Sequence, residues 1–126
     1  MDTAILVDEL DKSAVKLVEA LNKKDFEFTV AALMKNEDTE DWYIVFGVPG
    51  LRTRSSRNSL VVIYDVIKEN GLNLTLNDIK LLDDRDITLL LLKHRFNPNQ
   101  ELSRIVFTGN YIEGVRIPDS IIYQIK

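Results

Sequence analysis

The chain of 126 residues contains no cysteine, a single histidine, three prolines and five glycines. Without cysteine it can form no disulfide, no thiolate metal site and no cysteine nucleophile. A zinc site would need carboxylates or water as three of its four ligands, because His94 is the one histidine. No GxSxG motif offers a serine nucleophile to that histidine. These absences argue against zinc chemistry and against the common hydrolase mechanisms.

Long apolar runs are also missing. A membrane-spanning helix needs about 20 apolar residues in a row, whereas the longest run here, 87–92, is short and is interrupted by Thr88. The N-terminus has no basic stretch followed by an apolar segment, as a signal peptide would have. We therefore expect a cytoplasmic protein with no membrane contact.

Charge of positive sign is in the minority, since the formal net charge is −4. Affinity for nucleic acid comes mainly from neutralising phosphates, so this balance argues against a nucleic-acid partner. Hydrophobic residues make up 45% of the chain and charged residues 29%, which is typical of a soluble globular domain. The length and the lack of repeats or linkers predict one domain spanning residues 1–126.

The apolar residues recur with helical spacing in three places. Leu6, Leu10, Leu17 and Leu21 predict an amphipathic helix over residues 4–24. A second helix is predicted over 59–70, followed by an Asn-Gly stop signal. A short third helix is expected over 87–95, although its leucine-rich run is also compatible with a buried strand.

Strand patterns separate these helices. Apolar residues alternate over 26–34, and 42–48 is apolar on both faces, so the two segments are expected to pair as an antiparallel hairpin. Further strands are expected around 79–82 and, near the C-terminus, at 102–108, 111–112, 115–117 and 121–125. The predicted fold class is α+β: a single domain with a mostly antiparallel sheet, two main helices packed on one face and a short third helix.

A cluster of arginines and hydroxyl side chains occupies the predicted strand-to-helix connection. The N–H groups that open a helix have no internal partner, so this position favours anions. The sequence therefore predicts an anion- or nucleotide-binding segment at Arg52, Arg54, Ser55, Ser56 and Arg57. The alternative is a solvated loop whose arginines pair with acids such as Glu37 or Asp41. Neither of the common glycine-rich phosphate-binding motifs surrounds the segment.

The C-terminal segments carry more apolar residues than a strand with one solvent-facing side needs. Either both faces are covered within the domain, or the surplus is buried against another copy or another protein. On the second interpretation, the interface residues are Tyr111, Ile112, Ile121, Tyr123 and Ile125. The leading hypothesis is thus a non-enzymatic accessory or regulatory domain that acts by self-association, as a homo-oligomer, or by binding a protein partner.

Two acidic patterns carry weaker hypotheses. Asp83, Asp84 and Asp86 fit the start of a helix better than a magnesium site, because acids complement the helix dipole there. The segment from Pro118-Asp119 to Lys126 resembles the PD…(D/E)xK signature of magnesium-dependent nucleases. It departs from that signature at Gln124, which stands where a second metal-binding carboxylate belongs. No metal site and no cofactor is therefore predicted.

Overall fold

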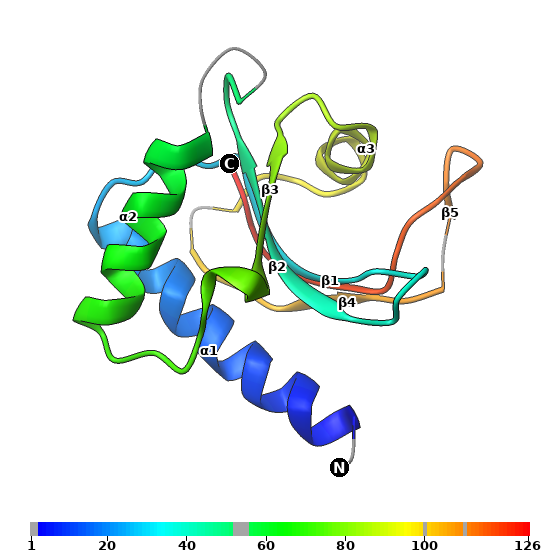
Figure 1. The fold of residues 1–126 in the computed structure, drawn as a ribbon. Helices are drawn as coiled ribbons and strands as arrows, with labels where there is room; N and C mark the ends of the chain where they lie inside the picture. The colour runs from blue at the N-terminus through cyan, green and yellow to red at the C-terminus, as the bar shows by residue number, and fades with distance from the viewer. Residues whose placement is uncertain (1–2, 52–55, 100, 110) are drawn as a thin grey trace.

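The structure is a computed structural model that describes residues 3–51, 56–99, 101–109 and 111–126. It confirms the α+β class, with three helices, a mixed five-stranded sheet and a separate two-stranded sheet (Figure 1). In chain order the elements are α1 (Thr3–Lys23), β1 (Val30–Lys35), β2 (Trp42–Val48), α2 (Ser56–Glu69), the 3₁₀ turn η1 (Leu76–Asp78), β3 (Ile79–Asp83), α3 (Ile87–Arg95), β4 (Ile105–Phe107), β5 (Tyr111–Ile112), β6 (Val115–Arg116) and β7 (Ser120–Ile125).

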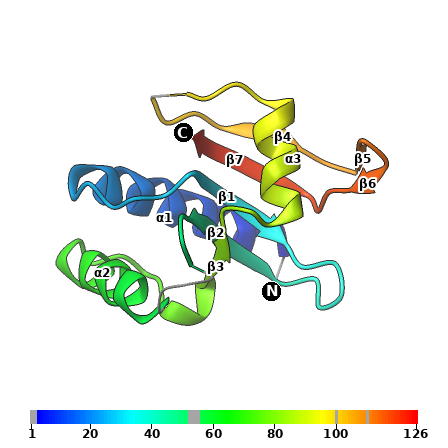
Figure 2. The same ribbon diagram turned by 90° about the horizontal axis from the view of Figure 1, so that it is seen from above.

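The strands of the main sheet lie in the order β3-β2-β1-β7-β4, which is visible from above in Figure 2. β1 and β2 form the predicted antiparallel hairpin, and β7 pairs antiparallel with β1 on its other side. β3 pairs with β2 in parallel, because α2 carries the chain back along the sheet between these two strands. β4 pairs antiparallel with β7 and forms one edge of the sheet.

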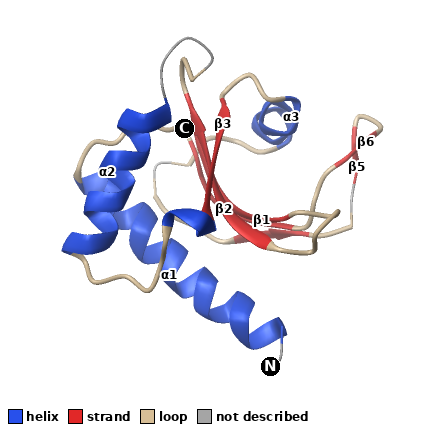
Figure 3. Cartoon of the chain, viewed as in Figure 1, coloured by secondary structure: helices blue, strands red, loops and turns tan. Residues whose placement is uncertain are grey.

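Helices cover both faces of this sheet. α1 and α2 lie on one face and α3 lies on the other (Figures 1 and 3). Alternate residues of β1 therefore enter two different cores. Ala31 and Leu33 pack in the cluster that contains α1 and α2, while Ala32 and Met34 pack in the cluster that contains α3. Burial on both faces explains why these central strands read as continuous apolar runs.

The alternating segment 26–34 begins as a loop. Strand pairing starts at Val30, although Phe26 and Phe28 are already buried. Their rings pack edge-on against Phe46 of β2, with centroid distances of 6.2 and 5.6 Å. The alternation predicted the burial of Phe26 and Phe28 correctly, but it overstated the length of the strand and missed that β1 is buried on both faces.

A polar cluster built around a buried Asp11–Tyr123 hydrogen bond ties α1 to the sheet. Opposite Ala31 and Ala32 the β1–β7 register shifts, which leaves Tyr123 as an extra residue of a β-bulge. The Tyr123 hydroxyl donates a hydrogen bond of 2.6 Å to Asp11 on α1. Arg104 donates to the other oxygen of the same carboxylate at 2.7 Å. Burial raises the pKa of Tyr123 well above its ordinary value, and the hydrogen bond to Asp11 raises it further.

Candidate functional surfaces

The predicted anion-binding segment lies mostly outside the described residues. Arg52, Arg54 and Ser55 are not described, whereas Ser56 and Arg57 form the exposed first turn of α2. The structure thus places the end of the segment at a helix N-terminus, as the sequence suggested. Anion binding there stays a prediction.

The predicted interface residues are mostly buried inside the domain. β7 lies between β1 and β4, and both of its faces are covered by the two cores. Ile121, Tyr123 and Ile125 are consequently buried, and Ile112 of β5 is buried in the cluster that contains α3. Tyr111 is different, because 63% of its surface is exposed. The surplus of apolar residues near the C-terminus is therefore explained largely by burial within one chain.

The acidic patterns occupy structural positions. Asp86 caps α3 by accepting the Thr88 N–H at 3.0 Å, which is the helix-start role expected for this acidic run. Asp119 and Lys126 flank opposite ends of the six-residue strand β7, so they lie roughly 20 Å apart and form no common site. Within the described ranges no three His, Cys, Asp or Glu residues are placed to hold a metal ion. No described helix combines the length and apolar character that a membrane crossing requires.

The edge strand β4 is the most exposed apolar part of the sheet. Val106 and Ile105 are 57% and 37% exposed. They point to opposite faces, since Ile105 lies beside Ile122 of the α3 core and Val106 beside Ile121 of the α1–α2 core. A strand at the end of a sheet also presents a row of N–H and C=O groups outward. A further strand placed here would cover both side chains and satisfy that row.

The two edges of the sheet differ in how they are protected. β3 carries the exposed Lys80 and ends at Asp83, and such charges discourage pairing with another strand. β4 consists only of Ile105, Val106 and Phe107 and carries neither charge nor proline. The β4 edge is therefore the open one.

The β5–β6 hairpin follows β4 and adds apolar surface. Tyr111 and Val115 are exposed on it. Arg116 anchors the hairpin to the β1–β2 turn through an ion pair of 2.9 Å with Glu37. His94 on α3 lies 3.3 Å from Glu113 on the other side of the hairpin. These two contacts link the hairpin to the β1–β2 turn and to α3. Figure 3 shows the hairpin beside the sheet.

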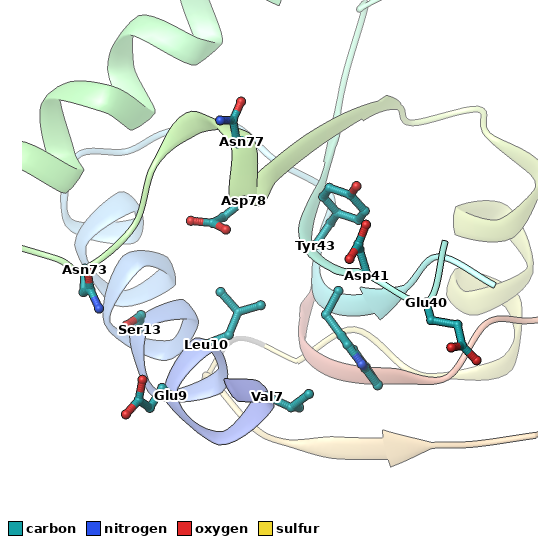
Figure 4. A pocket seen from close by; sticks show the side chains of 11 residues that line it. Val7, Glu9, Leu10, Ser13, Glu40, Asp41, Tyr43, Asn73, Asn77 and Asp78 are labelled. Carbon is teal, nitrogen blue, oxygen red and sulfur yellow. The ribbon is translucent and has the colours of Figure 1, made fainter. Parts of the chain in front are cut away.

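A second surface feature is a hollow of about 580 Å³ between α1, the start of β2 and η1 (Figure 4). We call it the acidic groove. Val7, Leu10 and Trp42 supply its apolar surface and pack against the main core. The remaining lining side chains are polar or acidic: Glu9, Ser13, Glu40, Asp41, Tyr43, Asn73, Asn77 and Asp78. Among the lining residues that the structure describes there is no lysine, arginine or histidine.

Local turns set the walls of the acidic groove. Asp78 belongs to the capping box of η1 and accepts the Thr75 N–H at 2.9 Å. Glu40 ends the β1–β2 turn with a φ of +64°, and its N–H donates to the Asn36 carbonyl. The side-chain oxygen of Asn36 also accepts hydrogen bonds from the backbone N–H groups of Asp38 and Thr39. Both acidic walls are therefore held by hydrogen bonds of their own.

The sequence alone predicted neither the exposed β4 edge nor the acidic groove, because both depend on how distant segments of the chain are arranged. The segment containing β4 was predicted as a strand, yet nothing in its pattern says that it lies at an edge. The acids of the groove come from three segments that are distant in the sequence, at positions 9, 40–41 and 78. The one sequence feature that pointed weakly to an exposed β4 edge is the absence of a charged residue in 105–107.

Comparison of the chain with models of protein families, with curated proteins and with solved structures finds no match. The functional argument therefore rests on the open β4 edge and on the acidic groove.

Proposed function

We propose that this domain acts as an accessory or regulatory protein by self-association through the β4 edge. The observation that carries the proposal is the pair Ile105 and Val106, exposed on opposite faces of an unguarded edge strand. A lone exposed apolar side chain is ordinary in a soluble protein. Exposure on both faces of one edge strand is what the addition of a neighbouring strand would remove.

The geometry of an antiparallel strand pair suits two identical chains. A two-fold axis beside Val106 sets Ile105 of one chain opposite Phe107 of the other. Each strand then offers its partner the same backbone hydrogen-bonding groups and the same apolar side chains. The two five-stranded sheets then become one continuous sheet. At the opposite edge, the charged residues Lys80 and Asp83 on β3 discourage strand pairing. The assembly is therefore limited to a dimer and does not extend into a fibre.

The contact is small. Stable protein interfaces bury about 800 Å² on each partner, and a strand of three residues supplies only part of that area. The hairpin side chains Tyr111 and Val115 are the nearest additional apolar surface along the chain. We therefore expect a weak, reversible dimer whose population depends on protein concentration.

Sedimentation velocity over a range of concentrations tests the proposal. The wild-type chain should sediment faster as its concentration rises. Val106→Lys should remain monomeric, because a lysine on the edge strand opposes strand pairing. Val61→Lys is the matched control, since Val61 on α2 is also 50% exposed and lies far from the edge in sequence and fold.

Two results would contradict self-association at this edge. A wild-type chain that stays monomeric up to about millimolar concentration would bind itself too weakly to matter. Equal loss of association in Val106→Lys and Val61→Lys would mean that added charge, and not the edge, controls assembly. Circular dichroism of both variants checks that each remains folded.

A further inference from the structure

We propose that the acidic groove binds an extended segment of another protein in which lysine or arginine residues alternate with apolar ones. The charge of the lining leads to this choice. Glu9, Glu40, Asp41 and Asp78 supply four carboxylates, and no described lining residue is basic. A cationic segment would gain from all four and meet no like charge.

Three of these carboxylates are available. The structure gives the Glu9, Glu40 and Asp41 side chains no ion pair or hydrogen bond within the described residues. Acids elsewhere are occupied, as Asp11 is by Arg104 and Glu37 is by Arg116. The groove therefore collects negative charge that no ion pair between described residues neutralises.

The apolar surface decides what kind of cation fits. Lysine and arginine bury their aliphatic stems on apolar side chains while their charged ends remain in a polar environment. Val7, Leu10 and Trp42 offer such a surface between the acidic walls. The tryptophan ring can also attract a cation directly. A bare metal ion would use none of this surface, and a fully apolar peptide would leave the carboxylates unused.

The size of the groove favours an extended segment over a helix. Its volume of about 580 Å³ lies in the range of ligand pockets. A helix with its side chains is about 10–12 Å across, whereas an extended segment projects side chains alternately to two sides. Such a segment can place apolar groups on the floor and direct basic groups to the walls at α1 and at the β1–β2 turn.

The chain contains its own reporter for this site. Trp42 is the one tryptophan and it lines the groove, so its fluorescence reports occupancy directly. The probe is a hexapeptide of alternating lysine and leucine, blocked at both ends. It should change the Trp42 emission in a saturable way. Raising the salt from about 0.1 to 1 M should weaken binding, because the Debye length falls from about 10 to 3 Å.

Matched variants separate this site from the general negative charge of the chain. Glu40→Gln combined with Asp41→Asn should weaken binding about tenfold, which corresponds to about 1.4 kcal/mol. Glu19→Gln combined with Asp65→Asn removes the same charge from exposed positions on α1 and α2, and it should leave the affinity unchanged. Val106→Lys should still bind the peptide, because the proposal is independent of self-association.

Three outcomes would overturn the proposal. The first is equal binding of a peptide in which glutamate replaces lysine. The second is equal weakening in both double variants, which would indicate unspecific attraction. The third is a saturable response to spermidine with none to the peptide, which would assign the groove to a small polycation.

Discussion

The position of Asp11 in the sequence already indicates that its carboxylate lies on the buried face of α1. Asp11 is three residues before Ala14 and seven before Val18, which is the spacing of the buried face of α1. A charged residue at that spacing calls for a partner inside the fold. The sequence could not name the partners, because Arg104 and Tyr123 lie 93 and 112 residues further along the chain.

Removal of the Tyr123 hydroxyl tests this cluster. We expect Tyr123→Phe to lower the free energy of unfolding by about 1–2 kcal/mol near pH 8, because Asp11 loses one of its donors. The folded-state pKa of Tyr123 is raised above the ordinary value near 10. The stabilisation is therefore complete below about pH 10 and is lost as the pH rises toward the folded-state pKa.

Urea unfolding followed by circular dichroism between pH 8 and pH 11 measures both effects. The difference between wild type and Tyr123→Phe should shrink above about pH 10. Tyr64→Phe is the control, since Tyr64 is exposed on α2, and its cost should be close to zero. A difference that stays constant with pH would speak against the hydrogen bond as its source.

At the scale of elements, the helices and most strand segments follow from periodicity and capping. α1 and α3 begin and end within one residue of the predicted bounds, and α2 starts three residues earlier than predicted. The sequence predicted that the two main helices share one face of the sheet, but it did not assign a face to the third helix. α3 lies in the connection between the edge strands β3 and β4, and it packs on the face that α1 and α2 leave uncovered.

Gly47 shows how closely α3 approaches the sheet. A Cβ atom on Gly47 would lie 2.7 Å from Cδ1 of Leu89 and 2.9 Å from Oγ1 of Thr29. Leu89 is fully buried, so it has little room to move aside. We expect Gly47→Ala to lower the free energy of unfolding by about 1–3 kcal/mol through overpacking.

A double-mutant cycle identifies the cause of that loss. Leu89→Ala alone should cost about 2–5 kcal/mol. Combined with Gly47→Ala, it should cost less than the sum of the two single changes, since the shortened side chain no longer meets the new Cβ. Additive losses in urea unfolding would show that Leu89 is not the obstacle.

The first turn of α2 carries the prediction for anions. Phosphate or sulfate should raise the melting temperature of the wild type, because helix N–H groups and arginines both attract anions. Replacing Arg52, Arg54 and Arg57 with alanine should abolish that increase. Replacing Lys12, Lys16 and Lys80 with alanine makes the same change in net charge and should preserve it. An unchanged melting temperature in the wild type would end this hypothesis.

At the scale of the whole molecule, the sequence predicted the α+β fold class, but not the order of the strands. The C-terminal strand looked like surplus apolar surface. It is instead the neighbour of β1 and completes the middle of the sheet. Local patterns report which residues are apolar, whereas strand order depends on pairings between distant parts of the chain. For the same reason the sequence predicted an interface at residues of β5 and β7, whereas the proposed interface lies at the edge strand β4.

The pairing of Val30 with Ile125 has a consequence for biosynthesis. While the nascent chain leaves the ribosome, β1 and β2 can form their hairpin early, yet the second edge of β1 stays open until residues 120–125 emerge. During that interval a strand that is apolar on both faces is exposed to solvent and to other nascent chains. Escape from aggregation then depends on how soon residues 120–125 follow and on chaperones that shield the open hairpin.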